Sequence, residues 1–215
     1  MVEILAYHGW GHDSGTWSKI ETLLGSRVSI KAWDRGYFYN NKVEVAFSAE
    51  SDKKIIMTHS FGLHQVPKHL FKLADGIIII SGFINFRKDK MLERMYDSLG
   101  ANTALMLGQY HANISYPSQS KWSMPRIFSI DLLKTDLERL KSSKFNPSLI
   151  SASVPKMFLA GESDKIVDIK TMEELATSLG IQIEWLKKSG HGIPYTKPEI
   201  IAQKIILFLS KLKRN

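Results

Sequence analysis

The sequence has no cysteine among its 215 residues. This absence excludes a disulfide framework, a thiolate metal site, a cysteine nucleophile and an iron–sulfur cluster. Long apolar runs are absent too: the longest aliphatic run, Ile77–Ile80, has the length of a strand, far short of the roughly 20 residues that span a bilayer. Glu3 and an immediate strand pattern stand where a signal peptide would show a basic start and an apolar stretch. We therefore expect a cytoplasmic protein that does not act on a membrane.

Acidic residues are fewer than basic ones: the sequence has 21 Asp and Glu against 29 Lys and Arg, which gives a net charge of +8. Such a field attracts nucleic acid, anionic lipid or an acidic protein. No run of Lys and Arg exceeds two residues and no nucleic-acid-binding motif is present, so we expect no nucleic-acid partner. The length fits one large domain or at most two small ones, and a composition of 44% hydrophobic and 23% charged residues is typical of globular proteins.

Short apolar segments alternate with helix-like stretches along most of the chain. The segments are bounded by Gly, Ser, Asp or Pro, as expected of strands that are buried on both faces. The predicted strands are Glu3–Tyr7, Val28–Ala32, Lys54–Met57, Ile77–Ser81, Pro155–Ala160 and Gln182–Leu186. The predicted helices are Gly15–Leu24, Phe61–Ala74, Asp168–Leu179 and Pro198–Lys213. This alternation predicts a mostly parallel sheet flanked by helices, which is an α/β fold.

Residues 87–150 interrupt the alternation. They contain no convincing strand, but helices are predicted at Lys88–Leu99 and Ile130–Leu140. The segment holds four of the eight methionines, with ten basic and six acidic residues. We expect a helical cap inserted into a core made of residues 1–86 and 151–215. Two interpretations stay open: an ordinary packing layer, or a lid whose adaptable apolar side chains hold a flexible ligand.

The pattern Thr58-His59-Ser60-Phe61-Gly62 follows a predicted strand and precedes a helix-like stretch. A serine on a sharp strand-to-helix turn projects its hydroxyl out of the backbone, and the crowded turn requires small neighbours, a need that Gly62 meets. Tyr7-His8-Gly9-Trp10-Gly11 follows the first strand, where glycines let backbone N–H groups point into a pocket. One such N–H and that of Phe61 are placed to stabilise an oxyanion, although each motif taken singly also fits an ordinary turn.

Two further candidates follow later strands. Asp164 comes directly after a strand and is placed either to orient an imidazole or to cap a turn. His191 lies between two glycines on a loop, where it is free to reach the end of another strand. The order Ser60, Asp164, His191 is the chain order of a hydrolase triad, and the carboxyl edge of such a sheet is where ligands bind. A metal site is not expected at His8 and His12, because the glycines between them argue against a helix.

Taken together, these motifs resemble the α/β-hydrolase superfamily over nearly the whole chain apart from 87–150. His8-Gly9-Trp10-Gly11 followed by Trp17 is most similar to the pimeloyl-[acyl-carrier protein] methyl ester esterases of biotin synthesis. The sequence departs from the superfamily pattern at Thr58, where glycine is usual, and at Pro67, which interrupts the helix after the nucleophile.

The resemblance implies an α/β-hydrolase fold with an inserted helical cap, and a serine carboxylesterase. Ser60 would be the nucleophile, His191 the general base and then acid, and Asp164 its orienting partner. Backbone N–H groups of Trp10 and Phe61 would form the oxyanion hole. No metal or organic cofactor is implied.

The expected substrate is a pimeloyl-type methyl ester presented on an acidic acyl-carrier protein, with the enzyme acting as a monomer. Basic cap residues would steer such a carrier, or would form an ordinary solvated surface. The candidate carrier contacts are Arg87, Arg94, Arg126 and Arg139. The alternatives are a broad small-ester carboxylesterase, an acyl thioesterase, or a hydrolase-fold binding protein without catalysis.

Overall fold

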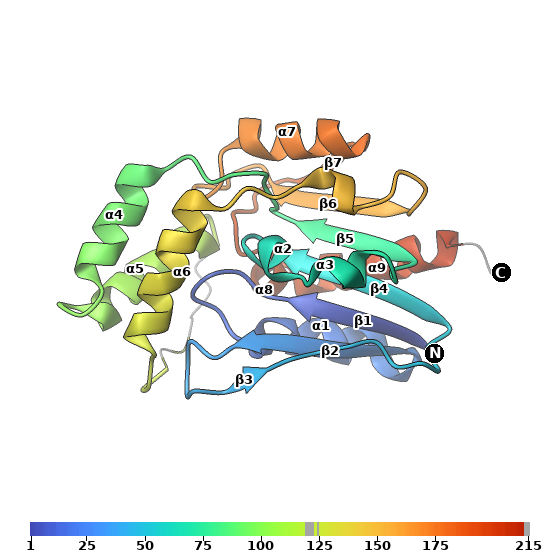
Figure 1. Ribbon diagram of the computed structural model, residues 1–215, viewed down its shortest axis with the longest axis horizontal. Helices are drawn as coiled ribbons and strands as arrows, with labels where there is room; N and C mark the ends of the chain where they lie inside the picture. The colour runs from blue at the N-terminus through green and yellow to red at the C-terminus, as the bar shows by residue number, and fades with distance from the viewer. Residues whose placement is uncertain (119–122, 124, 213–215) are drawn as a thin grey trace.

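A seven-stranded sheet forms the centre of the molecule (Figure 1). The computed structural model describes residues 1–118, 123 and 125–212. The strand order is β3-β2-β1-β4-β5-β6-β7, and every pairing of the described sheet is parallel except that of β2 with β3. The strands are β1 (Val2–Tyr7), β2 (Val28–Arg35), β3 (Lys42–Val43), β4 (Lys53–His59), β5 (Gly76–Ile80), β6 (Lys156–Gly161) and β7 (Ile183–Leu186).

Helices cover both faces of this sheet and one of its ends. Those of the core are α1 (Ser18–Leu24), α2 (Gly62–Gln65), α3 (Lys68–Phe71), α7 (Ile169–Leu179), α8 (Ile193–Thr196) and α9 (Pro198–Lys211). Those between β5 and β6 are α4 (Asp89–Ser98), α5 (Thr103–Ser115) and α6 (Ile130–Ser142). The described residues also form the 3-10 helices η1 (Ser14–Trp17), η2 (Gly25–Arg27) and η3 (Pro147–Leu149). No helix within the described ranges is both long and apolar enough to cross a membrane.

All six strands predicted from the sequence are present, and β2 and β4 run further toward their carboxyl ends than expected. The predicted helix Phe61–Ala74 is wrong as a single element. It is divided into α2 and α3, because Val66 adopts an extended conformation (ψ 123°) before Pro67. The strand β3 and the helix α5 were not predicted. The buried face of α5 includes Thr103 and His111, so its periodicity does not stand out as an apolar stripe.

The two faces of the sheet pack into two separate cores. The odd-numbered isoleucines of β5 lie in the core beneath α2, α3 and α7, and the even-numbered ones lie in the core beneath α1 and α9. This alternation follows from the two-residue period of a strand, and it explains why the run Ile77–Ile80 is apolar throughout. The central strands are therefore rigid supports for the loops at their carboxyl ends.

The helices α4, α5 and α6, which are called the cap below, lie together beyond the carboxyl ends of the parallel strands, at the left of Figure 1. Asp136 of α6 is fully buried and connects this layer to the end of β2 and the loop that follows it. Its carboxylate accepts hydrogen bonds from Arg35 Nε (2.6 Å) and Nη2 (3.0 Å) and from Tyr37 O–H (2.8 Å). Arg139 Nη1 donates a further bond at 2.8 Å. A charged hydrogen-bond network thus holds the cap helix against the sheet edge.

Candidate active site

Ser60 lies on the turn between β4 and α2, in a left-handed conformation with φ of 54°. Its N–H donates to the carbonyl of Ile80 at 2.8 Å, which fixes the turn to the neighbouring strand. A side chain at Gly62 would place its Cβ 2.2 Å from the carbonyl oxygen of Tyr7, so only glycine fits. This strained, crowded turn projects the hydroxyl of Ser60 from the carboxyl edge of the sheet.

His191 and Asp164 meet at the same edge, although 27 residues separate them. Nδ1 of His191 donates to Oδ2 of Asp164 at 2.8 Å, and both side chains are fully buried. The other carboxylate oxygen accepts from the N–H groups of Ile166 (2.8 Å) and Val167 (3.0 Å). Burial acts to raise the pKa of Asp164, but these bonds and the imidazole outweigh it and hold that pKa below its ordinary value. The pair is thereby kept in the tautomer that leaves Nε2 of His191 available.

Asp168 is the other carboxylate near this loop, and it lies elsewhere. It precedes the first residue of α7 and its side chain is half exposed. Its Oδ1 pairs with Nζ of Lys88 at 3.1 Å. The structure therefore places Asp164, and not Asp168, against the imidazole of His191.

Nε2 of His191 is buried and has no hydrogen-bond partner in the described part of the chain, so no bond joins it to Ser60 in this conformation. Such contacts are commonly long without substrate and shorten when it binds. Ser60 faces a cavity of about 20 Å³ beneath the cap, which is room for about one water. Apart from Ser60, this cavity is lined mainly by apolar side chains, among them Trp10, Phe86, Leu92, Leu137 and Leu140.

The glycine loop after β1 lies directly against the serine turn. A Cβ added at Gly9 would be 3.1 Å from Cβ of Ser60. The indole of Trp10 is held in place because its Nε1 donates to the carbonyl of Leu133 in α6 at 2.9 Å. Trp10 and Phe61 are both buried beside Ser60. Their backbone N–H groups remain the predicted oxyanion hole, and the close approach of the two turns supports this role.

His59, which directly precedes the candidate nucleophile, was not among the predicted site residues. Its Nε2–H donates to the backbone carbonyl of His191 at 3.0 Å, and the two rings lie 4.8 Å apart between centroids. Burial lowers the pKa of His59 to about 3, so the ring is neutral at physiological pH. His59 therefore positions the loop that carries His191. The only signal in the sequence was a polar residue at the variable position of the turn.

Further buried histidines support the glycine loop. Nε2 of His111 donates to the carbonyl of Gly11 at 3.0 Å, and Nε2 of His12 lies 3.1 Å from the hydroxyl of Tyr195. Burial lowers the pKa of His111 to about 3 and that of His12 well below its ordinary value. No cluster of three metal-binding side chains is found among the residues that the structure describes.

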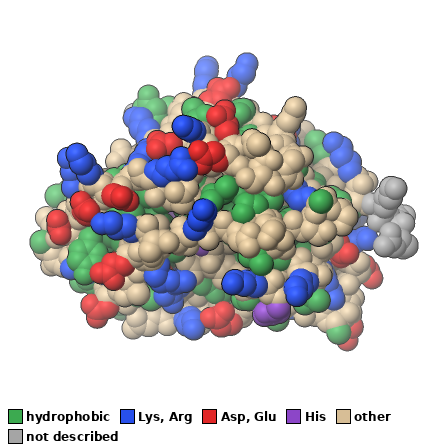
Figure 2. Space-filling view, turned by 45° about the horizontal axis from the view of Figure 1, so that its top comes forward, with side chains coloured by type: hydrophobic (Ala, Val, Ile, Leu, Met, Phe, Trp, Pro, Cys, Tyr) green, Lys and Arg blue, Asp and Glu red, His purple; other side chains and the backbone are tan. Residues whose placement is uncertain are grey.

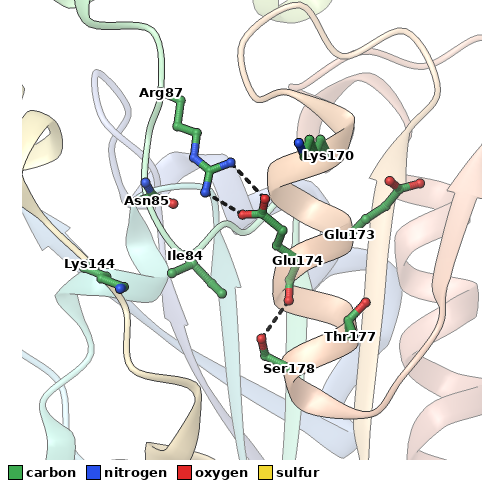
Figure 3. A pocket seen from close by; sticks show the side chains of 9 residues that line it. All are labelled: Ile84, Asn85, Arg87, Lys144, Lys170, Glu173, Glu174, Thr177 and Ser178. Carbon is green, nitrogen blue, oxygen red and sulfur yellow. Dashed lines mark hydrogen bonds and ion pairs between the residues drawn. The ribbon is translucent and has the colours of Figure 1, made fainter.

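The four arginines predicted to contact a carrier protein lie in different surroundings. Arg87 forms a double ion pair with Glu174 of α7, both N–O distances being 2.8 Å, on the wall of a groove of about 570 Å³ (Figure 3). Arg139 pairs with Asp136, and Arg126 is exposed near Tyr39, whose hydroxyl accepts from the Arg126 N–H. Arg94 lines a groove between α4 and α5. Figure 2 shows basic side chains interspersed with acidic ones over one face of the molecule.

Comparison with known proteins shows the fold. No family model and no curated protein sequence matches the chain. Among solved structures, an esterase from Exiguobacterium antarcticum is similar with a TM-score of 0.77 at 12% identity, covering 98% of this chain and 92% of that one. A hydrolase from Oleispira antarctica gives a TM-score of 0.75 at 16% identity with the same coverage. A carboxylesterase from Bacillus subtilis gives 0.65 at 19% identity, covering 97% and 83%. The chain has the α/β-hydrolase fold, as predicted.

Proposed function

We propose that this protein hydrolyses carboxylic esters through an acyl-enzyme formed on Ser60. One observation carries the proposal: the buried pair of His191 and Asp164 lies at the sheet edge where Ser60 projects from its strained turn. These are the nucleophile, base and orienting carboxylate of acyl transfer. The esterase and hydrolase structures that share the fold support this reaction class.

In the first half of the reaction, Oγ of Ser60 attacks the ester carbonyl carbon and its proton passes to Nε2 of His191. The tetrahedral oxyanion receives hydrogen bonds from the N–H groups of Trp10 and Phe61. His191 then returns the proton to the leaving alcohol, and the acyl group stays on Ser60. A water molecule then attacks the acyl-enzyme, with His191 as the general base, and releases the carboxylic acid from Ser60. The negative charge of Asp164 stabilises the imidazolium that forms in each half.

The cap has to move before an ester reaches Ser60. The cavity beneath it holds about 20 Å³, close to the space of one water and too small for any ester. Leu137 and Leu140 of α6 and Leu92 of α4 line it. We therefore assign to the cap the exclusion of bulk water during acyl transfer, with opening as a separate step.

The narrower substrate is a methyl ester of a medium-length acyl chain joined to an acidic acyl-carrier protein. The net charge of +8 supports it, since a basic surface steers an acidic partner. The ion pairs reduce the set of candidate contacts, because Arg87 and Arg139 are each paired with a carboxylate of this chain. Arg94 and Arg126 remain as the arginines to test. Exchanging both for Glu should lower kcat/KM for the carrier-linked ester about tenfold, with a weaker effect at high salt.

The test of the reaction class uses p-nitrophenyl butyrate and a fluorophosphonate probe. We expect the protein to hydrolyse the ester and to be labelled at Ser60, as located by mass spectrometry. Ser60→Ala should abolish both hydrolysis and labelling. Ser178→Ala is the control, because it removes an exposed hydroxyl of α7, and it should change neither hydrolysis nor labelling. Retention of most activity in Ser60→Ala, or labelling at another serine, would show that the mechanism is wrong.

A further inference from the structure

The loop after β1, which carries the predicted oxyanion donor Trp10, needs contacts from other segments to keep one conformation. Glycines flank Trp10 on both sides, and Gly11 is left-handed with φ of 67°. Glycine restricts the backbone less than any other residue, so the main chain alone does not fix such a loop. An oxyanion hole accelerates a reaction because its donors are already in place when the charge forms. The contacts that hold this loop therefore affect the rate of the reaction.

Two neighbouring residues of the cap helix α5 bind the carbonyls of this loop. The hydroxyl of Tyr110 donates to the carbonyl oxygen of Trp10 at 3.3 Å. Nε2–H of His111 donates to the carbonyl oxygen of Gly11 at 3.0 Å. The rings of Trp10 and Tyr110 also meet edge to face, with 5.1 Å between their centroids. Both side chains of α5 are more than nine-tenths buried, so water competes little for the two carbonyls.

The peptide on the other side of Trp10 is held by His8. Nε2 of His8 accepts from the N–H of Arg35 at 3.1 Å, and its Nδ1–H donates to the carbonyl of Gly9 at 2.8 Å. That carbonyl belongs to the same planar peptide group as the N–H of Trp10, so fixing the one fixes the direction of the other. The peptides before and after Trp10 are thus both held, and the cap holds the second of them.

The helix α5 is itself joined to the core near its carboxyl end. The carbonyl of Ile114 accepts from the N–H of Gly192 at 2.8 Å, in the loop that carries His191. Ile114 lies one helical turn beyond Tyr110, on the same buried face of the helix. This face of α5 therefore contacts both the loop of the predicted oxyanion donor and the loop of the candidate general base.

On the basis of the proposed function, we propose that α5 is part of the catalytic centre, and that Tyr110 and His111 are positioning residues for the N–H of Trp10 in the oxyanion hole. Each acts through a carbonyl of the glycine loop. Their bonds keep the loop in one conformation while the negative charge forms, so no rearrangement accompanies the chemical step. The cap thus contributes to the rate of acyl transfer as well as excluding water from it.

The first experiment removes each donor in turn. Tyr110→Phe removes the hydroxyl and leaves the ring, and His111→Leu removes the N–H. We expect kcat for p-nitrophenyl butyrate to fall about threefold in the first and about tenfold in the second, because the bond of His111 is the shorter one. KM should change by less than about twofold, since the bonds act on the transition state. His111→Gln keeps an N–H of similar reach and should recover most of the activity that His111→Leu loses.

Thr103→Val is the matched control. Its hydroxyl accepts from the N–H of Gly100 at 3.0 Å, about two turns from Tyr110, so the change weakens α5 without removing a bond to the glycine loop. It should lower the midpoint of thermal unfolding about as much as Tyr110→Phe does and leave kcat unchanged. An equal fall in kcat for Thr103→Val and His111→Leu would overturn the positioning role. So would an unchanged kcat in both Tyr110→Phe and His111→Leu.

An inhibitor reports on the oxyanion hole directly. A trifluoromethyl ketone forms a tetrahedral adduct with the serine hydroxyl, and the adduct's oxygen occupies the oxyanion hole. Its affinity should fall in His111→Leu by the same factor as kcat/KM, and should stay unchanged in Thr103→Val. If His111→Leu does not fold, Tyr110→Phe serves for the same comparison, because it keeps the ring in the core. An affinity that does not follow kcat/KM would contradict the role of these residues in the oxyanion hole.

Hydrogen exchange keeps this inference separate from the reaction class, because it needs no substrate. Exchange of the backbone amides of residues 8–12, measured by mass spectrometry, should be faster in His111→Leu than in the unmodified protein and in Thr103→Val. Hydrolysis by the unmodified protein together with unchanged exchange in His111→Leu would refute only the positioning role. Faster exchange in His111→Leu, without hydrolysis by the unmodified protein, would refute only the esterase.

Discussion

The buried carboxylate of Asp136 offers the strongest single test of how the cap is held on the core. Asp136→Ala removes the acceptor of four hydrogen bonds and leaves Tyr37 O–H buried without its partner. Removing one member of a buried ion pair costs about 3 to 5 kcal/mol. Arg35 is 18% exposed and regains some hydration, so we expect a loss of about 3 kcal/mol in the free energy of unfolding. For a chain of this size the midpoint of thermal unfolding should fall by about 6 to 12 °C.

Arg139→Ala is the matched control, because it removes a partner of the same carboxylate that is 47% exposed. Such surface pairs contribute less than about 1 kcal/mol. Both variants are compared by circular dichroism during heating and by urea unfolding, and a double-mutant cycle with Arg35→Ala measures the coupling directly. If Asp136→Ala lowers stability no more than Arg139→Ala does, Asp136 is not the anchor of the cap.

The same network predicts a pH dependence of stability. Burial acts to raise the pKa of Asp136, but the hydrogen bonds from Arg35 and Tyr37 outweigh it and hold the pKa below its ordinary value. A lowered folded-state pKa stabilises the protein above the unfolded-state pKa, which lies near 4, and this stability is lost as the pH falls through the folded-state value. The difference in unfolding free energy between the unmodified protein and Asp136→Ala should be full at pH 6 and shrink below about pH 4. A difference that grows toward low pH would contradict this sign.

Three further changes test the candidate site. Asp164→Asn should lower kcat for ester hydrolysis by orders of magnitude, because it changes the tautomer and orientation of His191. Asp168→Asn should have a mild effect, and the reverse order of effects would show that Asp164 is not the orienting carboxylate. His59→Ala should lower kcat more than it raises KM, because it frees the loop that carries His191. An unchanged pH–rate profile in this variant would contradict a positioning role for His59. Gly62→Ala should prevent stable folding or abolish activity, because its Cβ would lie 2.2 Å from a backbone oxygen. Unfolding and activity measurements that show a stable, active variant would contradict the need for glycine at this position.

Six strands and their mostly parallel pairing could be predicted from the sequence because the signals are local. A central parallel strand is buried on both faces, so it appears as a short apolar run such as Ile77–Ile80 between turn residues. The two-residue β3 and the helix α5 carry no such signal. In α5, His111 occupies a buried position because its ring finds a backbone carbonyl in the glycine loop, a partner 100 residues away.

The sequence by itself also determined the candidate residues Ser60, Asp164 and His191, since each follows a predicted strand in an α/β pattern. Only the tertiary structure decided which carboxylate faces the imidazole, because Asp164 and Asp168 are four residues apart and both lie after β6. It also decided that Arg87 pairs with Glu174 across 87 residues. A residue's type and spacing report the local backbone, whereas the partner of a charged side chain depends on which distant segments fold against it.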